Sequence, residues 1–496
     1  MSGLWENLSL GFGVAFSVSN LLFCFIGVLI GTITGVLPGI GPVGAISLLF
    51  PLTYGMHPVT SIIMLAGIYY GAQYGGSTTS ILVNIPGEAS SVVTCLDGYQ
   101  MAKQGRAGPA LGIAAFGSFI AGTIGIIFVM VLAFPLSEMG VKFGPPEYFS
   151  LATLALSIVI YLAQGPTLKA MIMAVLGVAL SQVGMDIMTS KAKFTFGIPA
   201  LLEGIGLVPL AMGLFGIGEV LSNFEQPEGI KIYEEKIESI LPTLRDWKES
   251  IGAILRGTFL GFPLGVIPGG GAVIASFVSY AVEKRVSKHP EKFGTGAIEG
   301  VAGPESANNA GSTGSFIPLF TLGIPSNAVT ALLLGGLIIH GMSPGPLLIK
   351  RNPELFWGTI ASMYIGNVML LILNLPLIGL WVKLLKVPYR ILYPFILFFC
   401  VIGAYSINYS SFDVMLMFIF GGVGYLFRKF QYEPAPLIMA FIMGSMLENS
   451  LRQSLAMSTG DLSIFITRPI SVTCLAIALF LLISPVFFKK RVQASH

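Results

Sequence analysis

The sequence predicts an all-α polytopic membrane protein with about 12 membrane segments in two structurally related repeats, which contain broken helices and re-entrant hairpins. Three observations lead to this fold class. Hydrophobic residues make up 54% of the 496 residues and charged residues only 10%, against roughly 25% charged in a soluble chain, and the mean hydropathy is +0.83. Apolar stretches of membrane-spanning length recur along the whole chain. Glycine- and proline-rich motifs of one half return in the other, and we expect the two repeats to have inverted topology.

The predicted membrane segments follow from length and polarity, because a helix needs about 20 apolar residues to cross a bilayer. The best candidates are residues 10–34, 110–135, 146–162, 167–183, 196–221, 356–381, 391–408, 412–427, 434–447 and 469–487. Further apolar stretches are interrupted, at 41–54, 59–70, 258–281 and 316–340. Together these stretches give about 12 crossings of the lipid bilayer.

One segment near the middle of the chain differs in composition. Residues 225–256 contain twelve charged residues of both signs, so we expect a solvated loop that links the two halves. This linker divides the chain into an N-terminal repeat at 1–224 and a C-terminal repeat core at 257–427. Residues 428–496 are predicted to add further C-terminal membrane helices.

Basic residues beside the spans indicate orientation, because cytoplasmic loops carry an excess of Lys and Arg. Three basic clusters occur, at 383–390, 428–429 and 489–491, with room for two crossings between one cluster and the next. All three can face the cytoplasm, which places the C-terminus inside. Lys350 and Arg351 would then lie outside, against the rule, and the N-terminal half has too few flanking charges to orient it.

The same motifs occur in the same order in both halves. Three pairs of segments match, at offsets of 230, 235 and 239 residues: Gly31–Gly41 with Gly261–Gly271, Ala72–Ser80 with Ala307–Ser315, and Ile85–Ala89 with Ile324–Ala328. Self-similarity in conserved order indicates repeated structural units. The sequence therefore predicts two related halves.

Each repeat contains a Pro-Gly-x-Gly break within apolar sequence, at Pro38–Gly41 and at Pro268–Gly271. A helix cannot continue through such a motif, because proline lacks a backbone donor and glycine permits left-handed backbone. In lipid, backbone of this kind must be buried in protein or line a wet cavity. Paired breaks are typical of the midplane site of secondary transporters, where helix N-termini face an anion and free carbonyls bind a cation.

The candidate binding residues lie in these breaks and in the Ser/Thr- and Asn-rich segments that follow them. We expect backbone amides and hydroxyls near Ser77, Thr78, Ser312 and Thr313 to bind the anion. The complete predicted substrate-binding set is Pro38, Gly39, Gly41, Ser77, Thr78, Asn84, Gly269, Gly270, Gly271, Asn308, Asn309, Ser312, Thr313, Ser326 and Asn327. A Na⁺ ion is a candidate ligand near Gly39, Asn84, Gly269 and Asn308.

Simpler roles stay open for each of these residues. Small residues in membrane helices often only permit close packing, and Gly31 and Gly35 have the spacing of a helix contact motif. Buried amides can equally hold helices together. Among the nearby ionisable residues, Glu88 and Glu305 fit a loop position and a ligand contact equally well, whereas Asp97 fits a loop better.

Other classes of site find little support in the sequence. The net charge of +3 gives no reason to expect a nucleic-acid partner. The four cysteines are isolated and the four histidines show no ligand spacing, so neither a metal centre nor a cofactor is expected. The sequence contains no Gly-x-x-x-x-Gly-Lys-Ser/Thr phosphate loop, which argues against uptake driven by ATP.

The chain resembles the large membrane subunit, of the TctA type, of the tripartite tricarboxylate transporters. The resemblance extends along essentially the whole chain, and its clearest segments are Gly31–Pro42, Tyr74–Gly87, Asp97–Tyr99, Pro304–Ala310 and Gly314–Pro325. It implies a permease of the bacterial inner membrane that works with a small four-helix membrane subunit and a periplasmic solute-binding protein. It also implies uptake of citrate-like tricarboxylates or related carboxylates, driven by a Na⁺ or H⁺ gradient.

We therefore expect the permease subunit of a binding-protein-dependent secondary transporter, and not an enzyme. A carboxylate channel and a secondary transporter for another organic anion are the alternatives. A channel would share the broken helices, but its downhill flux would depend on neither an ion gradient nor a periplasmic partner. A membrane-embedded enzyme would need a catalytic cluster, which the scarce His, Asp and Glu residues do not form in sequence.

Overall fold

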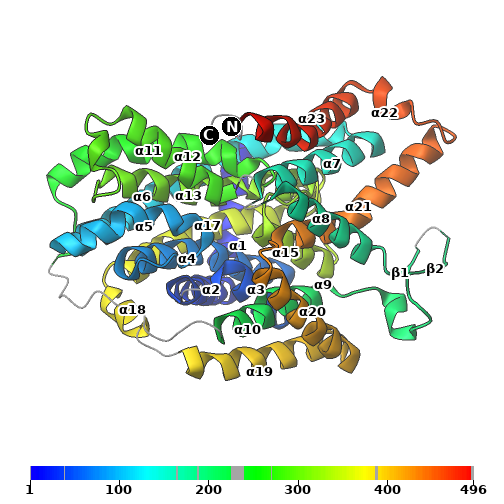
Figure 1. Ribbon diagram of the computed structural model, residues 1–496, viewed down its shortest axis with the longest axis horizontal. Helices are drawn as coiled ribbons and strands as arrows, with labels where there is room; N and C mark the ends of the chain where they lie inside the picture. Colours follow the sequence, from blue (N-terminus) through cyan, green and yellow to red (C-terminus); the bar gives the residue numbers. More distant parts are fainter. Residues whose placement is uncertain are drawn as a thin grey trace.

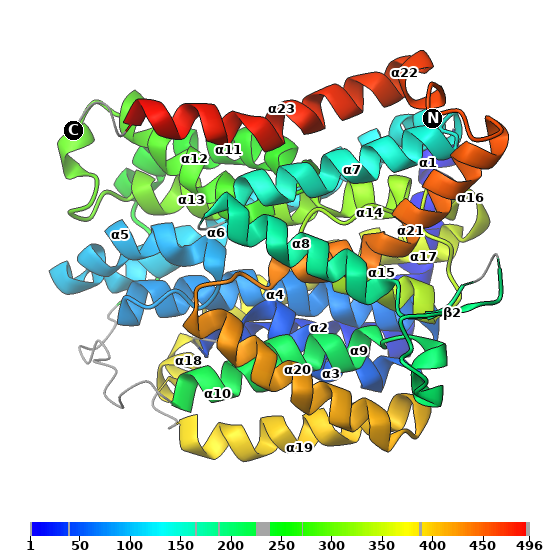
Figure 2. The same cartoon turned by 45° about the vertical axis from the view of Figure 1, so that its right-hand side comes forward.

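The long helices of this protein run in broadly the same direction, and α19 (Tyr389–Asn408) and α23 (Pro469–Val492) lie on opposite edges of the bundle (Figures 1 and 2). The structure is a computed structural model that describes residues 2–37, 40–163, 166–186, 189–224, 239–269, 271–385 and 389–492. The predicted all-α class is confirmed. A small two-stranded hairpin is the one departure from it among these residues.

The first half of the chain forms helices and short helical turns. Their bounds are α1 Ser2–Ala15, α2 Val18–Val36, α3 Gly41–Thr53, α4 Pro58–Val83, η1 Ala89–Ser91, α5 Val92–Met101, η2 Ala102–Arg106, α6 Ala107–Val141, α7 Pro145–Leu162, α8 Thr167–Ser181, η3 Pro199–Glu203, α9 Leu207–Ala211, η4 Met212–Ile217 and α10 Gly218–Phe224. The strands β1 (Gly184–Met185) and β2 (Ala192–Lys193) pair antiparallel between α8 and η3.

The second half is helical as well. Its elements are α11 Leu244–Val266, α12 Gly271–Val286, η5 Pro290–Lys292, α13 Glu299–Gly314, α14 Phe316–Leu322, α15 Ala328–Ile339, α16 Leu348–Arg351, α17 Pro353–Asn374, α18 Ile378–Leu384, α19, α20 Ser411–Lys429, α21 Ala435–Met457, α22 Ile464–Thr467 and α23.

Several of these helices have the length and polarity of membrane spans. Five among the described residues qualify by length and composition: Val18–Val36, Ala89–Val141, Pro145–Leu162, Pro353–Asn374 and Ser411–Lys429. Shorter apolar helices accompany them, at Gly41–Thr53, Thr167–Ser181, Leu207–Asn223, Ala328–Ile339, Tyr393–Asn408 and Pro469–Ser484. Large apolar side chains are exposed along the outer helices, as at Phe398 and Leu479. A multi-pass membrane protein explains these exposed surfaces, because lipid solvates them.

Two expectations about individual segments are wrong in part. The stretch 196–221 is not one span, because helix α9 begins only at Leu207 and the residues before it include Gly197, Pro199 and Gly204, which interrupt a helix. The solvated loop predicted at 225–256 does not extend to its predicted end. Residues 244–256 belong to α11, which begins with a capping box between Thr243 and Asp246, and residues 225–238 lie outside the described residues.

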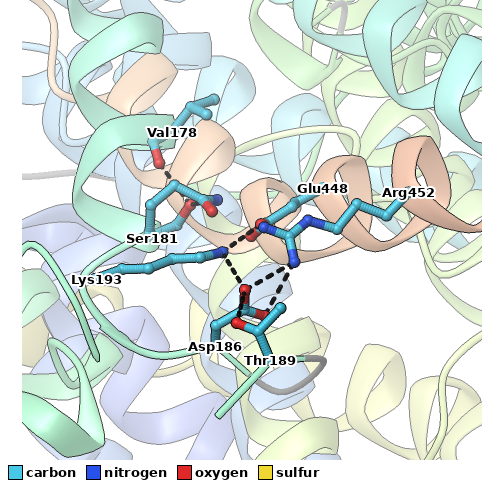
Figure 3. A network of polar contacts seen from close by, with 8 residues as sticks. Val178, Ser181, Asp186, Thr189, Lys193, Glu448 and Arg452 are labelled. Atoms are coloured by element: carbon cyan, nitrogen blue, oxygen red, sulfur yellow. Dashed lines mark hydrogen bonds and ion pairs between the residues drawn. The ribbon is translucent and has the colours of Figure 1, made fainter. Parts of the chain in front are cut away.

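The β1–β2 hairpin is held against α21 by a cluster of charged side chains. Asp186 accepts hydrogen bonds from Thr189 Oγ1 (2.8 Å) and from Arg452 Nη1 (2.8 Å), and it lies 3.4 Å from Lys193 Nζ. Figure 3 shows that Lys193 and Arg452 reach both Asp186 and Glu448. The hairpin, which projects from one edge of the bundle in Figure 2, is therefore tied to the body by ionic contacts.

Glycines pack two equivalent helix pairs into backbone contact. A Cβ atom at any of these glycines would collide with a carbonyl oxygen of the partner helix. The contacts join Gly27, Gly31 and Gly35 of α2 to Met64, Ile68 and Ala72 of α4, and join Gly257, Gly261 and Gly265 of α11 to Gly303, Ala307 and Gly311 of α13. Close packing therefore accounts for Gly31 and Gly35, as small residues in membrane helices often do.

Candidate functional site

Helices end and begin at both Pro-Gly-x-Gly motifs. Helix α2 ends at Val36 and α3 begins at Gly41, whose φ is +59°, while α11 ends at Val266 and α12 begins at Gly271, whose φ is +50°. Glycine is favoured at both positions because a Cβ atom is strained in left-handed backbone. Three predicted site residues in these motifs, namely Pro38, Gly39 and Gly270, lie outside the described residues.

A second pair of matching turns follows the breaks in each half. Asn84 after α4 and Gly323 after α14 both adopt left-handed backbone, with φ and ψ of 59° and 30° against 70° and 27°. Four residues later, Glu88 and Asn327 both cap the next helix through a capping box. Both pairs are separated by 239 residues, so the chain takes the same course at the two places.

The breaks and the two capped turns surround one cavity of about 710 Å³. Four short segments line this cavity together with Gly269, Tyr69 and Gln73: Ile40–Gly44, Pro86–Ala89, Gly271–Ile274 and Asn327–Val329. Other parts of the chain complete the wall: Val159, Leu162 and Ala163 at the C-terminal end of α7, Phe215 and Glu219, Phe277 of α12, and Arg428 with Glu433–Pro436 and Met439. The volume suits a small organic ligand, since ligand pockets typically hold about 300–1,000 Å³.

The N-termini of three helices open into this cavity. The first turns of α3, α12 and α15 all contribute lining residues, beginning at Gly41, Gly271 and Asn327. The N–H groups of a first helical turn have no partner within the helix, and the helix dipole places partial positive charge there. Their convergence favours an anionic ligand.

Four side chains in the described part of the cavity wall can carry a charge, namely the carboxyl groups of Glu88, Glu219 and Glu433 and the guanidinium of Arg428. Arg428 forms an ion pair with Glu219, and both residues line the cavity. Glu88 also lines it, and its carboxylate accepts a hydrogen bond of 2.8 Å from the backbone N–H of Ser90 at the start of η1. Backbone amides and one paired guanidinium are therefore the positive groups that face a ligand.

Hydrogen bonds within and between the two halves hold the walls of the cavity together. The N–H of Gly269 donates to the carbonyl of Ser326 (2.7 Å), which ties the second break to the second capped turn. Ser276 Oγ of α12 donates to the carbonyl of Ser90 (2.8 Å) in the other half. Asn327 Nδ2 donates to Tyr69 Oη of α4.

The predicted site residues divide between the cavity wall and the surrounding bundle. Gly41, Gly269, Gly271 and Asn327 line the cavity. The others that the structure describes are not among its lining residues, namely Ser77, Thr78, Asn84, Asn308, Asn309, Ser312, Thr313 and Ser326.

All of these other residues except Asn84 are buried. Asn308 Nδ2 lies 3.5 Å from Glu88 Oε1, directly behind the wall. Asn84 is exposed at the end of α4, whereas Ser312 and Thr313 are buried within α13. Of the predicted Na⁺ positions, Gly269 lies in the cavity wall, Asn308 lies behind it and Asn84 is exposed at the end of α4. Gly39 lies outside the described residues.

The three acidic residues singled out in the sequence have distinct surroundings. Asp97 is buried, and its Oδ1 accepts three backbone N–H bonds of 2.8 Å from Gly294, Gly296 and Ala297. It therefore orders the loop before α13. Glu305 is fully buried in α13, and Glu88 faces the cavity.

Sequence reasoning missed several wall residues. Tyr69 lies in an apolar run of α4 with no polar pattern to mark it, and Phe215 lies in η4 in a similar run. The sequence indicates Arg428 only as a flanking basic residue at the end of a span. A charged side chain at the end of an apolar helix carries no signal for a cavity that forms only in the folded chain.

Comparison with known proteins shows which family this chain belongs to. Residues 21–439 match the profile described as the tripartite tricarboxylate transporter TctA family. The chain belongs to the tripartite tricarboxylate transporter TctA family. The resemblance seen in the sequence motifs is thereby confirmed. As a member of the TctA family, the chain is a membrane component of a three-part transporter, with a binding protein and a small subunit as partners, and it is a transporter rather than an enzyme.

Two relatives of this TctA-family chain come from Agrobacterium vitis. An uncharacterized 52.8 kDa protein in the TAR-I ttuC' 3'region is 53% identical over 479 residues, which cover 97% of this chain and 95% of that protein. An uncharacterized protein in the TAR-II ttuC' 3'region is 56% identical over 219 residues, which cover 44% of this chain and 90% of that protein. No solved structure shows a significant match.

Proposed function

We propose that this chain is the permease subunit of a binding-protein-dependent secondary transporter that takes up tricarboxylates such as citrate, or related carboxylates. It operates in the bacterial inner membrane, with its C-terminus in the cytoplasm. A periplasmic solute-binding protein delivers the carboxylate, and a small four-helix membrane subunit completes the assembly. A Na⁺ or H⁺ gradient drives uptake.

The observation that carries this proposal is the convergence of three helix N-termini on one cavity of about 710 Å³. Carboxylates are small, multiply charged anions, so they match a site formed by the first turns of three helices and their dipoles. A transporter must also release its substrate, and a site with few formal positive charges makes this release easier. Arg428 is already paired with Glu219, so it adds limited attraction for the anion.

We also propose that residues 1–224 and 257–427 form two repeats of inverted topology, with residues 428–496 as an addition. The matched glycine contacts of α2–α4 and α11–α13 support this division, as do the equivalent turns at Asn84 and Gly323. The substrate would then bind between the repeats, as in other secondary transporters with paired interruptions. The capped turns at Glu88 and Asn327 would be the tips of re-entrant hairpins.

The direct test is uptake of labelled citrate into proteoliposomes that contain all three components. A Na⁺ gradient and a pH gradient are imposed separately, and other di- and tricarboxylates compete with citrate. Accumulation above equilibrium that requires the binding protein and one of the two gradients is expected. Downhill flux that is independent of both gradients and of the binding protein would instead identify a channel.

A further inference from the structure

A second and much smaller cavity lies between α4, α6 and α17, apart from the cavity described above. Its volume is about 10 Å³, which is about the space that one water-sized particle needs. Five of its eight lining residues carry a side-chain oxygen, namely Tyr74, Ser77, Thr78, Ser118 and Asn374. Leu111, Ala114 and Ala115 form the rest of the wall.

The hydrogen bonds around this cavity leave oxygen lone pairs free. Asn374 Nδ2 donates to the carbonyl of Leu370 (2.9 Å), while its Oδ1 is buried without a hydrogen-bond partner in the part of the chain that the structure describes. Ser118 Oγ accepts from Asn309 Nδ2 (2.7 Å). The hydroxyl of Ser77 donates to Glu305 (2.6 Å), which leaves its oxygen lone pairs for another partner. A group of oxygen acceptors of this kind suits a hard cation.

A buried carboxyl group, that of Glu305, stands beside these oxygens. Glu305 is 0% exposed, and its carboxylate accepts hydrogen bonds from Ser77 and Thr94. Within the described residues it forms no ion pair with a Lys, Arg or His side chain. A buried carboxylate without a counter-charge is costly, so a cation next to Ser77 would stabilise it.

We infer that this small cavity is a Na⁺ site, with the oxygens of Ser77, Thr78, Ser118 and Asn374 as ligands and Glu305 as the compensating charge one hydrogen bond away. The inference rests on the proposed function, because it makes Na⁺ the coupling ion of that transporter. Divalent ions are normally bound by at least one carboxylate oxygen directly, and no carboxylate of the described residues lines this cavity. Among the described residues of the cavity wall only Tyr74 can titrate, and its hydroxyl already donates to Asn367 Oδ1 (2.7 Å). The competing way to neutralise Glu305 is a proton on its carboxylate, and in that case Na⁺ would have no effect in the test below.

Helix α4 connects this site to the large cavity. Ser77 Oγ lies 3.1 Å from the carbonyl of Gln73, one turn earlier in the helix. Gln73 lines the large cavity, and its Oε1 accepts a hydrogen bond of 2.8 Å from Ser90 Oγ beside Glu88. An ion bound at Ser77 is therefore connected, through Gln73, to the capped turn that faces the carboxylate. Coupling between the two ligands requires a connection of this kind.

The test measures Na⁺ binding to the purified chain in detergent, without carboxylate or partner proteins. Heat-unfolding midpoints are compared in NaCl, KCl and choline chloride, and binding of ²²Na⁺ is measured directly. The parent chain is expected to gain stability only in NaCl, because a ligand of the folded state stabilises it. Thr78→Val and Asn374→Leu are expected to lower Na⁺ affinity about tenfold or more, the effect of losing one bond to a charged group. Thr359→Val in α17 is the matched control, since its hydroxyl donates only within its own helix, to Leu355.

The possible outcomes separate this inference from the proposed function. No Na⁺-specific stabilisation of the parent, or unchanged affinity in Thr78→Val, would overturn the site and leave water as its occupant. Should Asn374→Leu fail to give a monodisperse protein, Thr78→Val decides alone. Na⁺ binding without carboxylate uptake by the three-component system would contradict only the proposed function. Uptake that follows the pH gradient alone, in a chain that does not bind Na⁺, would contradict only the site.

Discussion

Asn327 Nδ2 donates a hydrogen bond of 2.9 Å to the hydroxyl of Tyr69. The two residues come from different halves of the chain, and both line the large cavity. Asn327 also caps α15, because its Oδ1 accepts the N–H of Thr330 at 3.0 Å. One side chain therefore fixes a helix N-terminus, holds the opposite wall and faces the ligand.

This arrangement allows charge to be changed in the cavity without removing a cap. Asp and Asn cap helices about equally well, so Asn327→Asp is expected to preserve the fold, with the hydroxyl of Tyr69 donating to the new carboxylate. The added negative charge lies where we expect the substrate carboxylate. We expect KM for carboxylate uptake to rise about tenfold or more, because juxtaposed like charges cost several kcal/mol. Initial uptake rates in proteoliposomes at varied substrate concentration measure this change.

The matched control is Asn352→Asp, which makes the same change at the N-cap of α17, outside the lining of the cavity. It is expected to leave KM close to that of the parent. Equal effects of the two substitutions would contradict an anion site at Asn327.

Gly271 offers a test of backbone geometry at the second break. Its φ is +50°, and an added Cβ would meet no atom closer than 3.6 Å, so Gly271→Ala carries mainly the cost of left-handed backbone, about 1 kcal/mol. Gly341→Ala carries the same kind of strain, at φ +70° with open space around it. Both variants are expected to lose similar thermal stability, but only Gly271→Ala is expected to slow uptake, because it alters the first turn of α12. Parallel unfolding and uptake measurements show whether the two effects separate.

The close contact of α11 with α13 leads to a prediction about stability. Gly265→Ala would place a methyl group against the carbonyl of Gly311, where backbone rather than a flexible side chain must move. We expect a loss of about 1–3 kcal/mol, typical of overpacking, measured as a lower unfolding midpoint in detergent. Gly13→Ala in α1 has no atom within 4 Å of the new group and is expected to be neutral or stabilising by up to about 1 kcal/mol. A midpoint for Gly265→Ala at or above that of the parent would contradict this account of the packing.

The helix interruptions could be predicted from sequence because proline and glycine act locally. Gly41 and Gly271 begin helices with positive φ, and the Pro-Gly-x-Gly motif alone indicates that a regular helix stops there. The start of α11 could have been recognised too, since Thr243 and Asp246 have the spacing of a capping box. The density of charges around them favours a solvated loop, but a helix can also extend into solvent when its charged residues share one face.

The composition of the cavity wall was harder to predict, because it depends on contacts between distant segments. The sequence predicts Ser77 and Thr78 in the anion site because of their hydroxyls, and in the structure these residues line the small cavity with Ser118 and Asn374. Periodicity says which residues share a helix face, but α4 is buried all round, so its sequence gives no preferred face. Only the packing of its neighbours determines which of its polar groups meet the large cavity.

The anchored hairpin gives a prediction about local stability. Asp186 bridges the turn of the hairpin and Arg452 of α21, with bonds of 2.8 Å to Thr189 and to Arg452. Its side chain is only 7% exposed. The variant Asp186→Asn removes a negative charge that neutralises Arg452 and Lys193, and so weakens the contact between the hairpin and α21. We expect the hairpin to open more often and trypsin to cleave after the exposed Lys191 about tenfold faster, since cleavage of a locally opened segment follows the population of the open form. Glu249→Gln is the control, because Glu249 pairs with Arg245 on the surface, where an ion pair contributes little. Equal cleavage rates for Asp186→Asn and the parent would mean that the backbone pairing of β1 with β2 holds the hairpin without its ionic anchor.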